Sequence, residues 1–406
     1  MRRKATVVAI VFAFLGLFSL GNGHVSLAAE PYVLGYLTDI TGAARANYAP
    51  DSEGFRLYMD VVNAGGGING HPVKVIVEDG KSDPSRSAAV AKKLIIEDKV
   101  LAIIGLGFSR SHPPVLALAK KDGVPVVTGY TCIEDVHDCK PGAIVFATGY
   151  IMHPDFHPGA YASARFLQEI KPKGSSVAVT GFATPGARVW TNLTEKWCKE
   201  MGYNVVYRDD IPPRAVDLSP WVNKVAKLNP DAYVTIVGAE LIIPQAASLE
   251  KMGYTNDIIF PDFTPEGDVR KCIKRLVGNG EWMVWGGRYA SVYEGLPEMK
   301  KIEEAMGKFG HQFPLSSRHC HGWTIGRLME QALTRAGWPC SRSDLIAALE
   351  KTDLDTKGLT GGPIRFTPTD HYGPTWWKAY RWNADKKALI PAMDWFQVDT
   401  STIANK

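Results

Sequence analysis

The 406-residue sequence contains none of the short motifs that mark the commonest catalytic and metal-binding sites. It has no HExxH pair, no GxxxxGK(S/T) phosphate loop and no spaced pair of CxxC motifs. The closest approach to a nucleophile elbow is Gly107–Ser111, which ends in serine where that turn requires glycine. Basic residues are scattered, and no nucleic-acid-binding motif is present. We therefore expect no enzymatic activity, no cofactor and no nucleic-acid partner.

Long hydrophobic runs are also missing, apart from one at positions 5–20 that follows three basic residues. Ser26 and Ala28 then occupy the −3 and −1 positions of a secretory cleavage site. A run of roughly 16 apolar residues is short for a membrane span of ~20. We interpret residues 1–28 as a signal peptide that is cleaved near Ala28, and we expect a periplasmic protein without a lipid anchor. Cleavage removes three basic residues and no acidic one, which lowers the formal net charge from +4 to +1.

Cysteines are few, six in all, but an exported protein can pair them. The candidate disulfide is Cys132–Cys139, which would close a short polar loop. Cys320 and Cys340 flank a predicted helix of about four turns, whose ends lie ~25–30 Å apart. Bridged Cα atoms lie within ~7 Å, so this pairing is not expected. Two cysteines stay unassigned: Cys198 and Cys272.

The remaining chain is longer than one hydrophobic core usually holds, which favours two lobes. Continuous apolar runs such as Tyr32–Leu37 are typical of parallel strands that are covered on both faces. They alternate with segments such as Asp51–Ala64, in which apolar residues recur at helical spacing. This alternation lasts to about Thr128 and restarts between Val177 and Phe260. The pattern predicts an α/β protein with two doubly wound, Rossmann-like lobes.

The last third of the sequence departs from this alternation. Residues 310–349 are rich in tryptophan and leucine and are predicted to be helical. Two later runs, at 361–366 and 376–382, have the pattern of hairpin strands.

One loop, Gly105–Ser111, has the setting of an anion-binding site. It follows a buried strand and precedes a helix that begins near His112. Free N–H groups and the positive end of a helix dipole meet at such a point. The alternative is that serine there is an ordinary helix cap.

Histidines and paired acids suggest other chemistry, but their context argues against it. His153 and His157 would lie together on a helix, but prolines interrupt that helix. In residues 319–321 the two histidines would lie on the same side only if this segment were a strand. A zinc site requires three or four converging ligands, so we predict no metal. The acidic pair at 209–210 precedes a proline-rich turn and is interpreted as solvated.

Several segments, taken in order, resemble the leucine/isoleucine/valine-binding family of periplasmic solute-binding proteins. The glycine-rich reversal between an amphipathic helix and a buried strand is the most specific of them. The segments that carry the resemblance are Leu37–Gly42, Asn63–Gly70, Asp83-Pro84, Ile103–Gly105 and Val124–Val127.

The resemblance implies a two-lobed fold in which three crossover segments join the lobes and a ligand cleft lies between them. It places residues 29–148 plus about 287–363 in the N-lobe, and 149–286 plus about 364–406 in the C-lobe. The crossings fall near 148–150, 285–289 and 362–366. Members of the family capture a small solute and deliver it to an ABC-type inner-membrane permease. We accordingly expect a monomer with a small-molecule solute and a permease as its partners.

The resemblance also assigns roles to polar residues of the cleft. Ser109 matches the serine that receives the ligand carboxylate in that family. Tyr130 and Thr131, in the next strand-end loop, would offer a carbonyl and a hydroxyl to an amino group. Asp262 falls on or beside the acidic residue that pairs with this amine.

Aromatic and acidic residues complete the expected ligand-binding set. Asn47 and Tyr48 lie on the first loop, where the family often has an aromatic side chain over the cleft. Phe108 would add flat apolar surface from the N-lobe. Phe182 and Glu240 would contact the solute from the C-lobe when the lobes close.

Three positions depart from the family pattern. An aromatic residue on the first C-lobe loop is replaced by Pro185 or Gly186, and a second aromatic position is Gly238. Cys132 stands where amino-acid binders carry a hydroxyl. The smaller side chains leave more room, so we expect a ligand bulkier than leucine, such as an aromatic or alicyclic carboxylate. Two alternatives stay open: a ligand-sensing receptor subunit of the same fold, and a hydrolase of small substrates.

Overall fold

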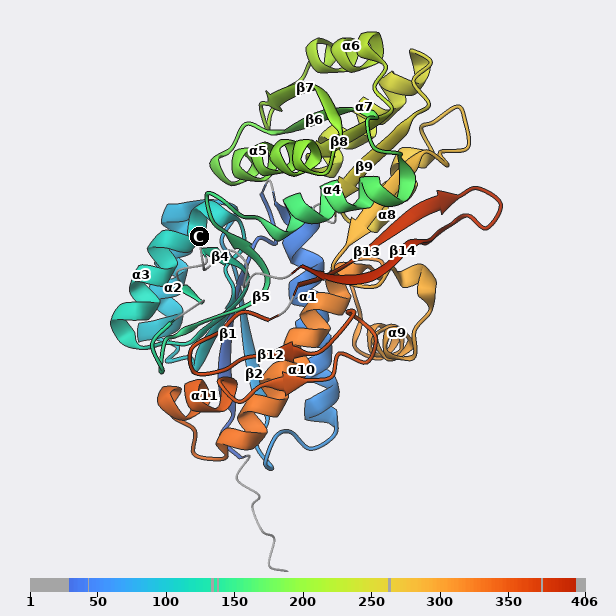
Figure 1. The fold of residues 1–406 in the computed structure, drawn as a ribbon. Helices are drawn as coiled ribbons and strands as arrows, with labels where there is room; N and C mark the ends of the chain where they lie inside the picture. Colours follow the sequence, from blue (N-terminus) through green and yellow to red (C-terminus); the bar gives the residue numbers. More distant parts are fainter. Residues whose placement is uncertain are drawn as a thin grey trace, which may run out of the picture.

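The structure is a computed structural model that describes residues 29–42, 44–132, 135–136, 139–261, 264–373 and 375–398. Its elements form two lobes, each built around its own sheet with helices on both faces (Figure 1). The predicted α/β class is therefore confirmed. The expected signal peptide and Asp262 lie outside the described residues. In the part of the chain that is described, no helix combines the length and the apolar character that a membrane span requires.

The first lobe contains a five-stranded parallel sheet in the order β2-β1-β3-β4-β5. Its strands consist largely of buried apolar residues, as the continuous runs in the sequence predict. The strands are β1 (Tyr32–Thr38), β2 (Val73–Asp79), β3 (Ala102–Gly105), β4 (Val126–Cys132) and β5 (Val145–Met152). The accompanying helices are α1 (Arg45–Ala64), α2 (Pro84–Ile96), α3 (His112–Asp122), α9 (Pro297–Phe309), α10 (Ser317–Ala336) and α11 (Arg342–Leu349), with the short η1 (Ser109–Ser111) before α3.

The second lobe contains a seven-stranded sheet in the order β14-β13-β10-β9-β8-β6-β7. Its β13 and β14 form an antiparallel hairpin at one edge. The strands are β6 (Ser176–Phe182), β7 (Asn204–Ile211), β8 (Ala232–Ile236), β9 (Asp257–Pro261), β10 (Met283–Gly287), β13 (Thr375–Asn383) and β14 (Ala388–Val398). The helices are α4 (Pro158–Ile170), α5 (Pro185–Glu200), α6 (Ser219–Leu228), α7 (Ala239–Lys251) and α8 (Glu266–Ile273), and η3 (Val292–Glu294) follows the sheet's last parallel strand.

Local sequence signals explain where these elements begin and turn. Helix α2 starts at Pro84, and the Asp83 carboxylate caps it by accepting a hydrogen bond of 2.7 Å from the backbone N–H of Arg86. In the glycine-rich reversal after α1, Gly67 has a φ of +78°, and an added Cβ would lie 2.2 Å from the carbonyl oxygen of His71. Only glycine fits there, which is why this turn is a specific feature of the sequence.

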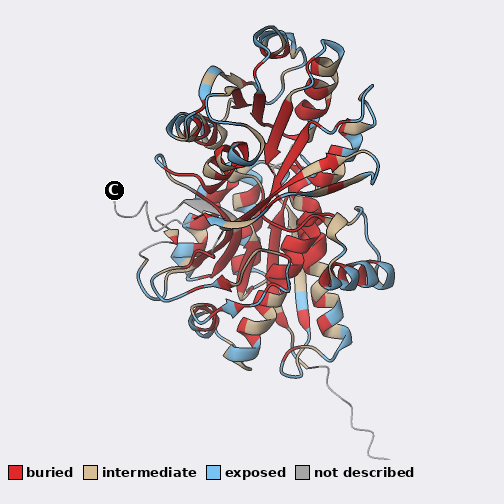
Figure 2. Ribbon diagram, turned by 45° about the vertical axis from the view of Figure 1, so that its right-hand side comes forward, coloured by how far each residue is buried: buried red, intermediate tan, exposed pale blue. Residues whose placement is uncertain are grey.

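Helices α1 and α10 cross at unusually short range, and this contact shapes the ligand-facing side of the first lobe. A Cβ added to Gly54 would lie 2.3 Å from the carbonyl oxygen of His319, and one added to Gly322 would lie 1.8 Å from that of Asp51. The two backbones therefore touch with no side chain between them. Buried residues make up the rest of the α1–α10 interface and both sheets, whereas exposed residues lie on the outer helices (Figure 2).

The chain remains with the first lobe longer than predicted before its last crossing. The short strand β12 (Ile364–Arg365) pairs with β11 (Asp353–Leu354), not with the later run. The backbone N–H of Gly373 then donates to the carbonyl of Ala147 in β5. The third crossing thus follows residue 373 rather than lying at 362–366, and the hairpin consists of β13 and β14. The other lobe boundaries stay a prediction, and β5, which pairs with β4 as far as Met152, keeps residues 149–152 in the first sheet.

The predicted disulfide involves one cysteine that the structure does not describe. The side chain of Cys132 lies outside the described residues, so its pairing with Cys139 stays a prediction. Cys139 itself has a free thiol in the described part of the chain. The other cysteines with described side chains are also free, namely Cys198, Cys272, Cys320 and Cys340. Burial raises the pKa of the Cys198 and Cys272 thiols to about 12, which makes both poor nucleophiles.

Candidate functional site: a cleft between the lobes

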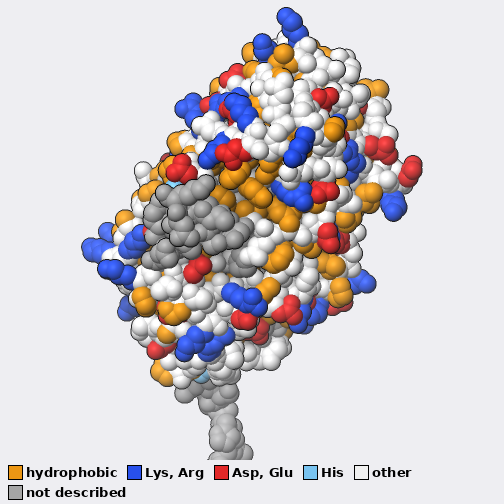
Figure 3. Space-filling model, in the orientation of Figure 1, with side chains coloured by type: hydrophobic (Ala, Val, Ile, Leu, Met, Phe, Trp, Pro, Cys, Tyr) orange, Lys and Arg blue, Asp and Glu red, His pale blue; other side chains and the backbone are white. Residues whose placement is uncertain are grey.

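A cleft lies between the two lobes and takes its lining from both. It contains about 1670 Å³ of empty space, counted to its open mouth. Apolar side chains gather at the junction between the lobes (Figure 3). The loops that follow β1 and β3 supply one wall, and the loops that follow β6 and β8 supply the other. Ligands of doubly wound proteins bind at these carboxyl ends of parallel strands.

The loop after β3 is held in place by a buried carboxylate, Asp39. Its two oxygens accept hydrogen bonds from the backbone N–H of Ser82 (2.7 Å), from the Ser82 hydroxyl (3.0 Å) and from the backbone N–H of Phe108 (2.9 Å). Burial raises the pKa of Asp39, although these hydrogen bonds oppose the rise. Gly107 adopts a φ of +64°, and an added Cβ there would lie 2.9 Å from Asp39 Oδ1. The position of Phe108 and Ser109 is therefore fixed by packing that tolerates little change.

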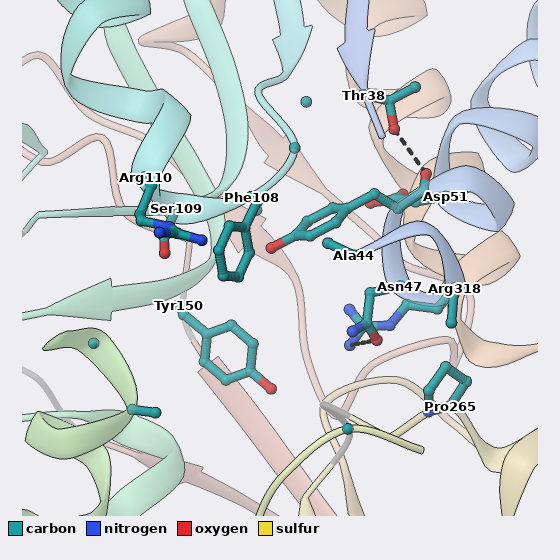
Figure 4. Close-up of a pocket in the computed structure, with 18 of the residues that line it drawn as sticks. Thr38, Ala44, Asn47, Asp51, Phe108, Ser109, Arg110, Tyr150, Pro265 and Arg318 are labelled. Atoms are coloured by element: carbon teal, nitrogen blue, oxygen red, sulfur yellow. Dashed lines mark hydrogen bonds between the residues drawn. The ribbon is translucent and has the colours of Figure 1, made fainter. Parts of the chain in front are cut away.

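Ser109 is the first residue of η1 and lines the cleft beside Phe108 and Arg110 (Figure 4). Among the described residues, its hydroxyl has no hydrogen-bond partner, and η1 has no side-chain cap. The neighbouring Ser111 hydroxyl, by contrast, lies 3.0 Å from that of Ser87 and is buried. Ser109 is thus the hydroxyl that this loop leaves available to a ligand, as the predicted anion site requires.

The start of α1 supplies the residues expected on the first loop. The Asn47 amide oxygen accepts a hydrogen bond of 3.4 Å from Nη2 of Arg318, and the Thr38 hydroxyl donates to the Tyr48 carbonyl at 2.9 Å (Figure 4). Tyr48 is partly exposed, yet desolvation by its surroundings raises the pKa of its hydroxyl to about 12. Tyr48 is therefore neutral at physiological pH and can donate a hydrogen bond into the cleft.

Sequence reasoning missed a buried chain of three polar side chains at the α1–α10 crossing. His321 Nδ1 lies 2.9 Å from Asp51 Oδ2, and its Nε2 lies 3.0 Å from the Thr148 hydroxyl. An acid, an imidazole and a hydroxyl in this order are also the parts of a hydrolase triad. Here the Thr148 hydroxyl lies behind the cleft wall, 3.4 Å from the Thr128 carbonyl. These hydrogen bonds therefore orient the His321 ring. The Thr148 hydroxyl, as the potential nucleophile of the three, does not face the cleft.

The other side of the cleft contains a stack of aromatic rings. The His157 ring lies 4.3 Å from that of Trp190, at an angle of 26°. Tyr150 lies 5.5 Å from His157 and 5.3 Å from Trp190. Burial, with the charge of Arg288, lowers the pKa of His157 to about 3, so this imidazole is neutral at physiological pH. The stack offers a flat, largely apolar wall to a ligand.

Small residues widen the cleft on the second lobe. Gly186 and Ala187 at the start of α5, and Gly238 and Ala239 at the start of α7, all line it. Gly186 and Gly238 are two of the positions at which the resemblance to the family predicts that an aromatic side chain is missing. These small residues line the second-lobe side of the cleft together with Phe182.

Charged residues of the lining are mostly basic. Four arginines line the cleft, and the acids among the described lining residues are Asp51 and Glu240. Glu240 lies at the rim, where desolvation raises its pKa and Asp268 adds to the rise. Two of the arginines, Arg288 and Arg318, are 3% and 7% exposed. Neither was predicted, because only the folded chain brings residues 288 and 318 next to the strand-end loops.

Six of the predicted ligand-binding residues meet in this cleft: Asn47, Tyr48, Phe108, Ser109, Phe182 and Glu240. Tyr130 and Thr131 lie in β4, but their side chains are outside the described part of the structure. Asp262 is outside it altogether. The ligand-binding roles assigned to all nine residues stay predictions.

The histidines do not converge on a metal site. In the described residues there is no group of three or more histidine, cysteine, aspartate or glutamate side chains that could hold a metal ion. His319 is buried between Glu53, at 3.1 Å, and the Ser316 hydroxyl, at 3.0 Å. The packing of α1 against α10 explains why His319 is buried between these two partners.

Comparison with known proteins agrees with this geometry. The model of the periplasmic binding protein family matches residues 31–387, which is most of the chain, and the chain belongs to that family. Its relatives and structural neighbours confirm the predicted type I fold of the branched-chain amino acid transporter type. An amino acid binding protein of Pseudomonas aeruginosa is 34% identical over 126 residues, which cover 31% of this chain and 32% of that relative.

Other matches extend over more of the chain at lower identity. A Leu/Ile/Val-binding protein of Escherichia coli is 25% identical over 42% of this chain and 44% of its own length. The match thus spans less than half of both these first relatives. The leucine-specific-binding protein of Salmonella typhimurium is 23% identical over 96% of this chain and its whole length.

Solved structures share the fold. A branched-chain amino acid ABC transporter protein from Thermus thermophilus with bound valine gives a TM-score of 0.77 at 16% identity, covering 92% of this chain and 98% of that one. A solute-binding protein from Rhodopseudomonas palustris in complex with 4-hydroxybenzoate gives 0.74 at 17% identity, covering 92% and 100%. At these identities the likeness concerns the fold alone.

Proposed function

We propose that the protein is the extracytoplasmic component of an ABC importer that captures a small carboxylate with a flat, apolar body. The solute binds between the two lobes, the lobes close over it, and the closed form delivers it to an inner-membrane permease. In this proposal the protein is exported to the periplasm and catalyses no reaction.

The observation that carries this proposal is the composition of the cleft wall. Ser109 offers a hydroxyl at a helix start, four arginines exceed the two described acids, and a ring stack provides a flat apolar surface. An anionic group and an aromatic body are the chemistry that such a wall favours. Proteins of the same fold from Rhodopseudomonas palustris hold benzoate and hydroxylated benzoates, which supports the class of solute.

The first test is Ser109→Ala. We expect wild-type protein to bind benzoate or a related ring carboxylate more tightly than leucine in calorimetric titrations. Loss of a charge-assisted hydrogen bond of ~1.5–3 kcal/mol should weaken carboxylate binding about 10- to 100-fold in Ser109→Ala. Ser111→Ala is the matched control, because that hydroxyl is buried against Ser87 rather than facing the cleft.

Two results would contradict the proposal in different ways. If leucine competes fully against every ring carboxylate, the proposal that the solute is a carboxylate with a flat, apolar body is wrong. Affinity within about twofold of wild type in Ser109→Ala would remove the assignment of the carboxylate to this loop.

A further inference from the structure

Arg288 occupies the place where the lobes are joined. It follows β10 directly and precedes Ala290, whose backbone N–H donates to the carbonyl of Leu359 in the first lobe. Its guanidinium carbon lies 3.7 Å from the centroid of the Tyr150 ring, near the end of β5. Both side chains line the cleft, and both are buried. A cation over an aromatic face gains most when the pair is desolvated, as this pair is.

Gly149 makes room for this arginine. A Cβ added to Gly149 would lie 2.2 Å from Nη1 of Arg288 and 2.2 Å from the carbonyl oxygen of Gly129. The guanidinium therefore rests against the backbone of β5 close to the first crossing, at a distance that any side chain would prevent.

A residue just before the third crossing joins the same cluster. The Tyr372 hydroxyl donates a hydrogen bond of 3.1 Å to the carbonyl of Gly149, and Tyr372 is buried. We call Gly149, Tyr150, Arg288 and Tyr372 the crossing junction, because they lie in or next to the three segments that join the lobes: near the end of β5, directly after β10 and just before residue 373. The positive charge of Arg288 influences titratable groups on both sides of this junction. That charge opposes the rise in the pKa of Tyr372 that burial causes, and it adds to the fall in the pKa of His157.

We infer that Arg288 binds the negative group of the solute at the crossing junction and thereby couples ligand charge to closure of the lobes. This inference rests on the proposed carboxylate function and assigns the anion to a second residue besides Ser109. A ligand shifts a conformational equilibrium only through contacts that differ between the two states. Hinge motions change torsions in the segments that cross between domains. A charge bound at the junction contacts those segments directly, whereas a charge bound on one lobe does not.

The inference predicts a loss of charge discrimination in Arg288→Gln. Benzoate and its neutral isostere benzamide serve as probes, with affinities measured by calorimetry at fixed pH and salt. We expect wild type to prefer benzoate by about 100-fold, the range of a charge-assisted bond, and Arg288→Gln to prefer it by less than about 10-fold. Benzamide affinity should change little, which shows that the variant cleft is folded. Arg288→Lys, which keeps the charge and loses the planar stacking, should recover part of the preference and stands in if Arg288→Gln does not fold.

Arg270→Gln is the matched control for total charge. Arg270 is exposed and lies over the Tyr293 ring on the second lobe, and it is not among the described residues that line the cleft. We expect its substitution to change the preference for benzoate by less than about threefold, as for a solvated charge.

The outcomes separate this inference from the function on which it rests. Wild-type protein that binds no carboxylate overturns the proposed function and the inference together. Wild-type protein that prefers benzoate, with Arg288→Gln or Arg288→Lys keeping the whole preference, overturns the inference and leaves the function intact. An equal loss of preference in Arg270→Gln also overturns it, because the effect then belongs to overall charge.

Discussion

Gly322→Ala is expected to destabilise the first lobe severely, although it adds a single methyl group to a helix. The new Cβ would lie 1.8 Å from the Asp51 carbonyl oxygen and 2.8 Å from the Phe55 backbone nitrogen. Both are backbone atoms, so no side-chain rotation relieves the overlap and the two helices must separate. We expect a loss of about 3 kcal/mol or more in the free energy of unfolding, at the upper end of overpacking effects. The melting temperature should fall by roughly 6–12 °C.

Gly307→Ala is the matched control for this change. Gly307 lies in helix α9, is exposed, and has no atom within 4 Å of an added Cβ. Replacing glycine by alanine in an open helix position stabilises it by about 0.5–1 kcal/mol. Opposite signs for these two substitutions in thermal melts would establish the contact between α1 and α10. A melting temperature of Gly322→Ala within ~2 °C of wild type would contradict it.

Ala187→Trp is expected to abolish solute binding while the protein stays folded. Ala187 is a half-buried residue of α5 that lines the cleft on the second lobe. An indole there occupies the space next to Trp190 that a solute needs, and overpacking of about 3 kcal/mol corresponds to an affinity loss of at least about 100-fold. Calorimetric titration with the best wild-type carboxylate measures the loss.

Ala384→Trp provides the same change of volume on the same lobe but away from the cleft. This half-buried residue lies in the turn between β13 and β14, and that hairpin projects from the lobe (Figure 1). The affinity of Ala384→Trp for the same carboxylate should remain within about twofold of the wild-type value. Undiminished binding in Ala187→Trp would show that the solute does not enter the space between α5 and the first lobe.

Features that depend on neighbouring residues could be predicted from the sequence. Continuous apolar runs predict the parallel strands, because a strand covered on both faces has no polar side. The loop from Gly105 to Ser111 was expected to present a serine at a helix start, and Ser109 lies there with an available hydroxyl. This could be predicted because the strand, the turn and the helix that form its setting follow one another directly in the sequence.

Features that depend on distant contacts could not be predicted. Arg288 and Arg318 enter the cleft only because α10 packs on α1 and because β10 ends beside the first crossing. The third crossing was placed too early since the run at 361–366 has a strand pattern, yet β12 pairs with β11 in the first lobe. The disulfide between Cys132 and Cys139 stays a prediction, because it rests on their spacing alone and spacing does not determine whether two thiols meet.

Closure of the lobes around a solute is the central claim, and small-angle X-ray scattering tests it most directly. Wild-type protein that is saturated with its best carboxylate should have a smaller radius of gyration than the ligand-free protein. Ala187→Trp, under the same solute concentration, should show no change. An identical radius of gyration for wild type with and without every solute that calorimetry shows to bind would contradict the claim.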